Sequence, residues 1–495
     1  MEEKEQTKNI KFNDSQREIG QKSDKVLIQT SKSEMVSNSE IIKYEECPER
    51  WFNLVAYCFC LFANGFQWFS FSQISKQFEI HYSISLWKIK LLTMIYFIIY
   101  PFAFIPEILF MEKYNLKIGL LLPSICTIIG SFFKIFTNYD NTLSICYIGQ
   151  ILSGLFRPLL LNCPGKIASN WFKEDKRAII CSIICLSDTA GILVGYLCNL
   201  VYITKDPNKD DFKDQLLRYF LSEFILIFLL CIPGFFINKS KPDILSSPSQ
   251  SEKISGFIQN IKMLFTNKRF IFLLISYFFI VGYYFILGNI INNLLDIYNI
   301  SKQQCTIIYS VSIIAGIISS IIISYFLDKY KKYKLFFIIL SASSMIFQIF
   351  LTFLIELSKS KELNGFAICI IFYILINAAI IPFYSLGINY SCEIAYPVAE
   401  SYSGGFMMVM PQICGIACFY LFDHLLKNNS NKPWIVNVIL IIFLAISFFA
   451  ILFLDNQLSR YDIDKDGKIK GEDKHSEEDV DKEVKVEIKQ NEIIP

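Results

Sequence analysis

Twelve long apolar runs are the feature that most constrains this chain of 495 residues. A bilayer core about 30 Å thick is crossed by roughly 20 apolar residues of helix, and each run is long enough to do so. Backbone groups in lipid must find their hydrogen bonds within the segment, so each run is expected to be a helix. The expected spans are 52–73, 89–110, 116–137, 142–163, 177–200, 217–237, 269–290, 305–327, 334–355, 365–388, 402–422 and 434–454. The sequence therefore predicts an all-α membrane protein with twelve transmembrane helices.

The composition agrees with this fold class and excludes several functions. Apolar residues make up 53% of the chain and Phe occurs 46 times, which is typical of a protein that has lipid as its main solvent. The net charge is only +2 and the basic residues gather in short loops, which excludes a nucleic-acid-binding protein. Most of the 15 Cys lie inside apolar runs, where a free Cys acts as a small hydrophobe, so no disulfide framework is expected. An enzyme is not expected, because no nucleophile–base pair, zinc spacing or phosphate loop is found.

Charges in the short loops predict the orientation. Four basic loops fall on one side of the expected spans, and the positive-inside rule makes that side cytoplasmic. These loops are Lys113 to Lys117, Lys166 to Arg177, Lys262 to Arg269 and Lys329 to Lys334. Two potential glycosylation triplets, at Asn299 and Asn428, fall on the other side. We expect a multi-pass monomer with both termini cytoplasmic, in the plasma membrane or an internal membrane.

A polar segment rich in Ser and Pro divides the spans six and six, and it is typical of a linker. The expected parts of the chain are a disordered cytoplasmic N-terminus (1–50), a six-helix bundle (51–237), a cytoplasmic linker (238–268), a second six-helix bundle (269–455) and a charged cytoplasmic tail (456–495).

An internal repeat supports the division into two bundles. "LFMEKYNLK" follows the second span and "FLDKYKKYK" follows the eighth, so each half has an acidic residue at a helix end, Glu112 or Asp328, followed by basic residues. The two positions are separated by 328 − 112 = 216 residues. A parallel repeat of two six-helix halves resembles the plan of the major facilitator superfamily, in which one site lies between halves that rock around it.

Three motifs resemble those of the feline leukaemia virus subgroup C receptor family. They are "NGFQW" at 64–68, "CPGKIASNWF" followed by "KEDKRA" at 163–178, and "CEIAYPVAESYSGGFMMVMPQICGI" at 392–416. The family carries N-A-F-Q-W, L-P-S-R-I-A-S-x-W-F and V-E-I-T-Y-P-E-S-E-G with Q-I-F-G-I at these places, and the similarity covers all twelve spans in order. The resemblance implies facilitated transport of choline and ethanolamine or export of haem, with other small organic solutes in related branches.

The resemblance also implies a binding site. In choline-carrying members the ammonium lies against the Trp of the first-span motif and a Tyr of the seventh span, near a Gln of the fifth and a Gln of the eleventh. Those positions are Trp68, Phe285, Thr189 and Gln412 here, so two residues match and two differ. Phe285 keeps the aromatic face but loses the hydroxyl, and Thr189 replaces an amide by a shorter hydroxyl.

Two arguments from the residues themselves bear on this site. Trp offers the best cation–π face among the side chains, and 285 − 68 = 217 is nearly the repeat offset, so Trp68 and Phe285 are expected as two walls of a cavity between the halves. Packing against lipid or a neighbouring helix is the alternative for each ring. Asn64 and Gln67 are expected to line the cavity or to support the helix, and Gln412 could instead bond to another helix.

Charged residues inside expected spans cost about 2.5–3.5 kcal/mol each on insertion scales, and two of them stand out, Arg157 and Asp188. Arg157 and Asp188 both fall roughly 13–17 Å from the inner membrane surface at 1.5 Å per residue, so they are expected to pair. The family usually has Gln and Asn at these positions. Structural neutralisation, gating, and a proton- or cation-carrying role for Asp188 are all open. Glu393 is expected to form a salt bridge that holds the closed state, and Glu112 and Asp328 are further gating candidates.

The tail contains "DIDKDGKIKGED", which resembles the start of an EF-hand calcium loop. The candidate ligands are Asp462, Asp464, Asp466, the carbonyl of Lys468, and Asp473 in place of the usual Glu. A solvated charged tail is the alternative, and no other cofactor is expected.

The sequence therefore predicts an alternating-access transporter of a small organic cation, with choline or ethanolamine first, acting as a uniporter. One alternative is a transporter of haem or a vitamin-like amine, with proton coupling through Asp188. None of the three His lies in an expected span, which weakens the haem hypothesis. The other alternative is a transport-inactive receptor or calcium-responsive sensor on the same scaffold.

Overall fold

The structure is a computed structural model that describes residues 47–71, 74–114, 116–139, 143–202, 212–237, 256–360, 363–428 and 432–466, together with 242, 247 and 249. In this part of the chain the regular secondary structure is helical throughout, which confirms the all-α class. The long helices are α2 (Glu49–Trp68), α4 (Leu86–Lys113), α5 (Leu116–Ile135), α6 (Ser144–Leu155), α9 (Arg177–Tyr202), α10 (Phe212–Phe235), α12 (Lys268–Asp296), α13 (Lys302–Tyr330), α14 (Tyr333–Ser360), α15 (Gly365–Ala395), α16 (Glu400–Asn428) and α17 (Trp434–Leu452). The shorter ones are α3 (Ser75–Tyr82), the 3₁₀ turn η1 (Phe136–Tyr139), α7 (Arg157–Leu161), α8 (Pro164–Trp171) and α11 (Phe257–Thr266).

Among the described residues, eleven helices are long and apolar enough to cross a bilayer. They correspond to the second to twelfth expected spans. The first expected span corresponds to α2, which has 20 residues and ends at Trp68 instead of 73. It is not among the eleven, because polar residues such as Asn53, Asn64 and Gln67 lower its hydropathy.

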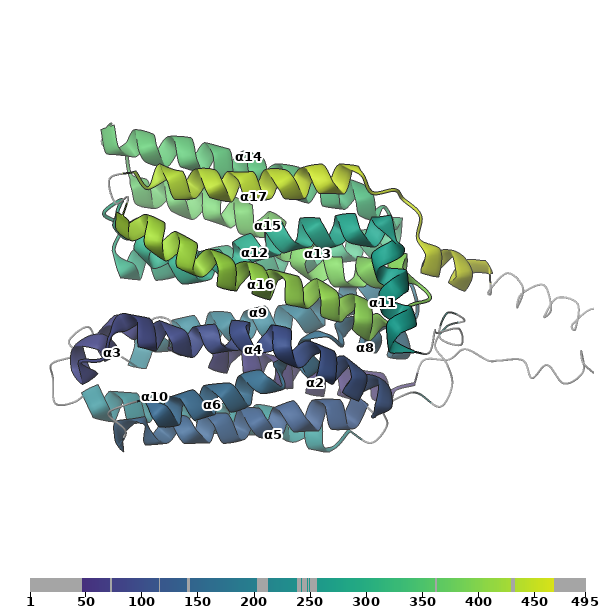
Figure 1. Ribbon diagram of the computed structural model, residues 1–495, viewed down its shortest axis with the longest axis horizontal. Helices are drawn as coiled ribbons and strands as arrows, with labels where there is room; N and C mark the ends of the chain where they lie inside the picture. The colour runs from purple at the N-terminus through teal and green to yellow at the C-terminus, as the bar shows by residue number, and fades with distance from the viewer. Residues whose placement is uncertain are drawn as a thin grey trace, which may run out of the picture. The chain divides into compact units, whose positions relative to one another are not determined.

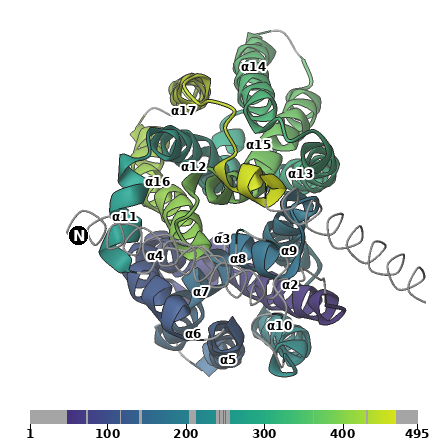
Figure 2. The same ribbon diagram turned by 90° about the vertical axis from the view of Figure 1, so that its right-hand side faces the viewer.

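The long helices form two groups that lie side by side (Figures 1 and 2). Helices α2 to α10 pack with one another in the first group, and α12 to α17 do so in the second. The groups meet where α9 packs against α13 and α15, and where α4 packs against α16. A site between the groups is therefore built from these helices and from the residues next to them.

The fourth expected span is interrupted. Helix α6 ends at Leu155 and α7 begins at Arg157, with Phe156 between them at φ −102° and ψ 12°. The cause is local: Pro158 has no N–H to donate to the carbonyl of Gly154, and in a continuous helix its ring would clash with that carbonyl. The apolar run predicted one continuous span over 142–163, and the break instead places Arg157 at the start of a separate short helix.

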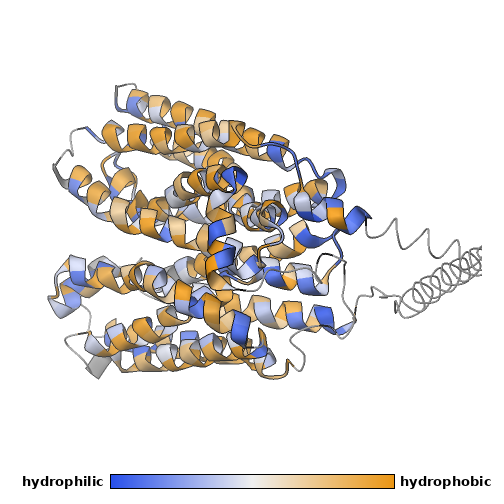
Figure 3. Ribbon diagram, turned by 45° about the vertical axis from the view of Figure 1, so that its right-hand side comes forward, coloured by the Kyte–Doolittle hydropathy of each residue, from blue (hydrophilic) through white to orange (hydrophobic). Residues whose placement is uncertain are grey.

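Apolar residues predominate along the long helices (Figure 3), and many of the large ones have exposed side chains. Phe102 is 79% exposed and Phe353 64%, which in a bundle of this kind indicates contact with lipid. Hydrophilic residues gather at the end of the bundles where the loops Lys166 to Arg177 and Lys329 to Lys334 lie, and we call this end the basic end.

Two segments expected to be polar connections contain helices. Within the expected linker, α11 packs Phe257 against Tyr402 and Phe265 against Phe406, with ring centroids 6.0 and 5.1 Å apart. Its apolar residues recur at helical spacing, so a short amphipathic helix forms inside an otherwise polar segment. At the start of the expected tail, residues 459–466 are also helical.

Candidate functional site

The aromatic pair implied by the family resemblance and supported by the repeat offset is brought together between the two groups of helices. The ring centroids of Trp68, at the end of α2, and Phe285, on α12, are 5.7 Å apart in an edge-to-face arrangement. Phe97 on α4 lies 5.0 Å from Trp68 and 5.8 Å from Phe285. All three side chains are buried. We call these three residues the aromatic cluster; its rings touch one another and do not stand apart as the two cavity walls that were expected.

A cation of the chain itself lies on the face of Trp68. The Cζ atom of Arg157 is 4.4 Å from the centroid of the Trp68 ring. Its Nη2 donates to both carboxylate oxygens of Asp188, at 2.9 and 2.8 Å, and its Nη1 donates to Oδ1 of Asn64 at 2.5 Å. The expected pair therefore forms, and it ties α7 to α9 and α2 with both charged side chains buried. Because both Asp188 oxygens are engaged, this geometry supports charge compensation.

Asn64 and Gln67 support the helix packing. Nδ2 of Asn64 donates to Oγ1 of Thr127 at 3.0 Å and to the carbonyl of Ser153 at 3.1 Å. The amide orientation of Gln67 that satisfies its neighbours points the nitrogen at the Thr127 carbonyl and the oxygen at the Ser131 N–H, each at 3.0 Å. Of the two expected roles, the geometry gives Gln67 the supporting one, because its amide faces α5 and α6 and not the aromatic cluster.

Thr189 and Gln412 are both buried near the interface. Oγ1 of Thr189 makes a long hydrogen bond of 3.5 Å to the carbonyl of Cys185 in its own helix. Gln412 lies on α16, one turn before Gly415, where an added Cβ would lie 2.8 Å from Phe97. Among the described residues its Nε2 has no hydrogen-bond partner. Gln412 therefore offers a free donor on a helix that packs against the aromatic cluster.

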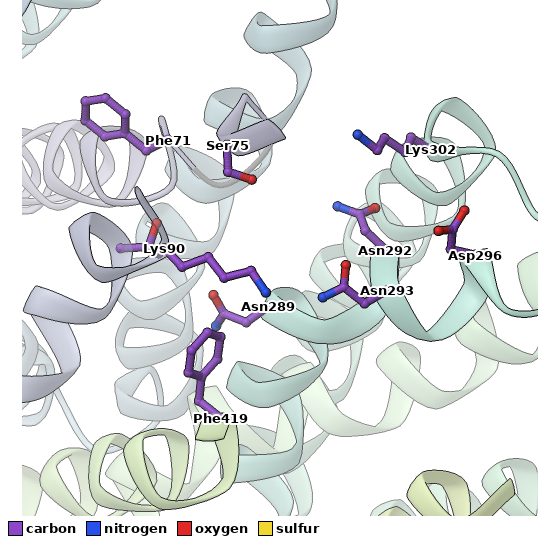
Figure 4. A pocket seen from close by; sticks show the side chains of 10 residues that line it. Phe71, Ser75, Lys90, Asn289, Asn292, Asn293, Asp296, Lys302 and Phe419 are labelled. Carbon is purple, nitrogen blue, oxygen red and sulfur yellow. The ribbon is translucent and has the colours of Figure 1, made fainter. Parts of the chain in front are cut away.

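A pocket opens between the two groups at the end opposite the basic end, and we call it the interface pocket (Figure 4). Its volume is about 650 Å³, counting the part open to solvent. Lys90 extends from α4 toward Asn289 on α12 (Figure 4). The lining residues are Phe71, Ser75, Lys90, Thr93, Asn289, Asn292, Asn293, Asp296, Lys302 and Phe419. The carbonyl of Thr93 accepts a 3.1 Å hydrogen bond from Nε1 of Trp68, so the pocket is one residue away from the aromatic cluster.

At the basic end the two groups are joined by the acidic residues that the repeat singled out. Asp328 accepts hydrogen bonds from the backbone N–H groups of Ala178 and Ile179, at 3.1 and 2.8 Å, and so caps the N-terminus of α9. Glu112 accepts a short hydrogen bond from the hydroxyl of Ser401, near the N-terminus of α16. Carboxylates are favoured at helix N-termini, where N–H groups are unpaired. Both residues thus hold the two groups together at this end.

Arg177 forms a second connection at the basic end. Its Nη1 lies 2.7 Å from the Asp464 carboxylate and 4.0 Å from that of Glu393. Its Nη2 donates to Oγ of Ser247 at 2.6 Å. The salt bridge expected for Glu393 is therefore present, but the shorter ion pair is to Asp464 in the helical segment 459–466. That partner was not predicted, because nothing in a charged tail indicates a buried contact.

Arg460 adds a further ion pair in the same place. Its Nη2 lies 3.0 Å from the Glu400 carboxylate and its Nε donates to Oγ of Ser249 at 3.0 Å. Burial acts to lower the pKa of Arg460, but the carboxylates of Glu400 and Glu393 outweigh it, and the pKa is raised above its usual value. The guanidinium therefore stays charged while the basic end is closed.

The calcium hypothesis stays a prediction. Asp462, Asp464 and Asp466 lie in the helical segment, where Asp464 is buried and the other two are exposed. Asp464 also accepts from the backbone N–H of Ser249 at 2.8 Å. Among the described residues no group of three or more acidic, His or Cys side chains could hold a metal ion. Lys468 and Asp473 lie outside the described residues.

A second buried ion pair was missed by the sequence analysis. Nζ of Lys134 on α5 lies 2.9 Å from the Glu223 carboxylate on α10, and both side chains are buried. The same Nζ donates to Oγ of Ser70 at 2.7 Å and to the carbonyl of Gln67 at 3.0 Å, at the C-terminal end of α2. The signal was available, because each residue is a charge inside an expected span.

Known proteins match most of the chain. The family model described as Major Facilitator Superfamily matches residues 54–358. The choline/ethanolamine transporter FLVCR2 of Homo sapiens is 24% identical over 84% of this chain and 79% of its own length. The choline/ethanolamine transporter FLVCR1 of Felis catus is 25% identical over 85% of this chain and 76% of its own. A solved structure of the transporter FucP in the outward conformation matches 81% of this chain and 98% of FucP, with a TM-score of 0.60 and 12% identity, which bears on the fold alone.

Proposed function

Since the chain belongs to the major facilitator superfamily, we propose that it moves a small amine-bearing solute of the choline/ethanolamine class by alternating access. It is an integral multi-pass membrane protein and a transporter, not an enzyme. Its relatives bear out the resemblance of the sequence motifs to the feline leukaemia virus subgroup C receptor family.

The observation that carries the proposal is the contact of Trp68 with Phe285 across the two groups of helices. A desolvated ammonium gains about 2 kcal/mol or more on the face of a Trp, and a second ring increases the aromatic surface around it. The two rings come from opposite halves of the repeat, where a transported solute must be held during the rocking motion. The relatives named above as choline/ethanolamine transporters support the same class of solute.

The route follows from the two ends of the bundles. The interface pocket leads through Thr93 to Trp68, while the contacts of Asp328, Glu112 and Arg177 close the basic end. The positive-inside rule supports placing the basic end in the cytoplasm, so the pocket would face outside. Transport would then proceed by closure over the pocket and opening of the basic end, with the gradient of the solute as the driving force for a uniporter.

The haem alternative gains no support from the histidines in the described part of the chain. His81 lies near the end of α3, outside the long helices. His424 was expected in a loop; it lies within α16, but it is exposed near the helix end and away from the aromatic cluster. Neither imidazole is placed to bind haem iron between the two groups of helices.

Uptake into proteoliposomes tests the proposal. Purified protein is reconstituted and given labelled choline, ethanolamine, pyridoxine or haem, in the wild type and in Trp68→Ala. Losing about 2 kcal/mol of cation–π attraction weakens binding by roughly thirtyfold. We therefore expect uptake of choline or ethanolamine by the wild type, and a matching rise in KM in Trp68→Ala.

The matched control is Trp434→Ala, because Trp434 is 45% exposed at the start of α17 and lies outside the aromatic cluster. It should keep wild-type uptake at equal protein content. Uptake of neither amine by the wild type, or unchanged uptake by Trp68→Ala, would contradict the proposal.

A further inference from the structure

The strongest position for a cation in this site is already taken. The Arg157 guanidinium lies 4.4 Å from the centroid of the Trp68 ring, and Arg157 and Trp68 are 1% and 0% exposed. A Trp face removed from water is where a cation is attracted most strongly. A second cation cannot share this face with Arg157 without close repulsion between like charges.

We infer that Arg157 is a tethered stand-in for the ammonium of the solute: it occupies Trp68 in the empty transporter and leaves that face when the solute binds. This inference rests on the proposed function, since it needs a cationic solute that reaches Trp68. It makes Arg157 a residue that sets affinity by competition.

The hydrogen bonds of Arg157 allow such an exchange. The ion pair with Asp188 is made by Nη2 alone, through two hydrogen bonds, and the bond to Asn64 by Nη1. Nε of Arg157 has no partner among the described residues. A rotation about the Nη2–Asp188 contact would take the guanidinium off Trp68 and keep the ion pair, at the loss of the hydrogen bond from Nη1 to Asn64. A second ring, Tyr96, lies 5.9 Å from Cζ and can receive the displaced group.

The backbone is interrupted at this point. Arg157 is the first residue of the short helix α7, directly after the break at Phe156 inside the fourth span. Its guanidinium is therefore placed by its side-chain bonds at a break in the helix.

The charge balance of the site explains what the Arg157 guanidinium contributes to the empty transporter. With Arg157 and Asp188 paired, the empty site carries no net charge. The Arg157 guanidinium then occupies the face of Trp68 when no solute is bound. An empty carrier whose site is neutral can return to the conformation that faces the solute without an unpaired buried charge, and a uniporter makes this return in each cycle. The cost is weaker binding, because the solute must displace the guanidinium before it gains the Trp68 face.

Equilibrium binding to the purified full-length protein tests the inference. Choline is titrated by calorimetry into the wild type, Arg157→Gln/Asp188→Asn and Asp188→Asn. The double substitution removes the competing cation and leaves no unpaired buried charge. We expect its Kd for choline to be about tenfold lower than that of the wild type, as removal of a competitor predicts. Asp188→Asn alone keeps the guanidinium and removes its counter-charge, so its Kd should be higher than that of the wild type.

The two variants are expected to change the Kd for choline in opposite directions. If the ion pair were only structural, its loss would shift the Kd of both variants in the same direction. Introducing Trp68→Ala into the double variant should abolish the gain, which shows that the added affinity arises at Trp68. Equal Kd values in the wild type and the double variant, with equal melting temperatures, would overturn the inference.

The same measurements distinguish this failure from failure of the proposed function. If the wild type takes up choline and Trp68→Ala does not, while the double variant gains no affinity, the proposed function stands. The inference that Arg157 competes with the solute for Trp68 is then wrong. If the wild type takes up neither amine but the double variant binds choline through Trp68, the stand-in is supported and the proposed solute is wrong. Absence of choline binding in all folded variants overturns the inference.

Discussion

Two pairs of opposite charges are buried inside the membrane-spanning helices of the first group, and they show what a single residue can reveal. Arg157 and Asp188 stood out because lipid penalises each charge, and the count along the helices placed them at one depth. Lys134 and Glu223 obey the same rule and also pair, at 2.9 Å. Reading every intramembrane charge in this way would have found both pairs.

The Lys134–Glu223 pair gives a prediction about stability. Lys134→Met leaves the Glu223 carboxylate buried without its cation, which we expect to cost about 3–5 kcal/mol. The double variant Lys134→Met/Glu223→Leu removes both charges and should recover most of that loss. Thermal unfolding of the purified protein, followed by light scattering or intrinsic fluorescence, measures both. A single variant that melts no lower than the double variant would show that the pair does not stabilise the fold.

At the scale of elements, the close approach of α2 and α9 positions the site. Asp188 lies on α9, and a Cβ at Gly65 of α2 would lie 2.6 Å from its carbonyl oxygen. Farther along α9, "GILVG" places Gly191 and Gly195 one turn apart against the backbone of Phe62 and Phe66. Small residues at this spacing let helices approach closely in lipid. The pattern is visible in the sequence, but it does not say which helix is the partner.

Gly191 tests this packing. A Cβ at this position would overlap the carbonyl of Phe62 and lie 2.9 Å from the Phe66 nitrogen. Gly191→Ala therefore forces α2 and α9 apart, and we expect a loss of about 1–3 kcal/mol with a lower melting temperature. Gly154→Ala is the control, because the nearest atom to its Cβ, in Tyr96, lies at 3.4 Å. Equal melting temperatures for the two variants would rule out close α2–α9 packing at Gly191.

At the scale of the whole molecule, the two ends of the interface differ. The interface pocket opens at one end, while at the basic end Asp328 caps α9 and Arg177 pairs with Asp464. The helical segment 459–466 thus takes part in the contacts at the basic end. Ser249, which donates to Asp464, and Ser247, which accepts from Arg177, lie in the connection between the two groups, so residues before and after the second group both take part in these contacts.

Closure at the basic end can be tested by hydrogen exchange. Asp464→Asn removes the charge that binds Arg177, and a hydrogen bond between charged groups contributes about 1.5–3 kcal/mol. We expect amide exchange about tenfold faster or more in peptides covering 178–185 at the start of α9. Glu356→Gln, which breaks the partly exposed pair with Lys359, should leave these peptides unchanged. Unaltered exchange in Asp464→Asn would mean that the tail contact does not hold this end closed.

How far the sequence alone reaches is clear from particular residues. The spans and the charge pair of Arg157 and Asp188 followed from rules that act along the chain, namely span length and the cost of charge in lipid. The pairing of Trp68 with Phe285 was implied by the family resemblance and supported by the repeat offset. The interruption before Pro158 is also local, since proline cannot continue the hydrogen bonding of the helix, but a hydropathy count does not register it, because Phe156 and Pro158 are compatible with a membrane span.

The sequence by itself determined that this chain is an all-α membrane protein, because lipid imposes the same requirement on every span independently. Only the tertiary structure decided which groups face one another. It placed Arg157 on the ring where a solute cation was expected, turned Gln67 toward α5, and gave Arg177 the carboxylate of Asp464. These contacts depend on how each helix is rotated and packed against helices distant in sequence, and hydropathy along one chain carries no information about that rotation.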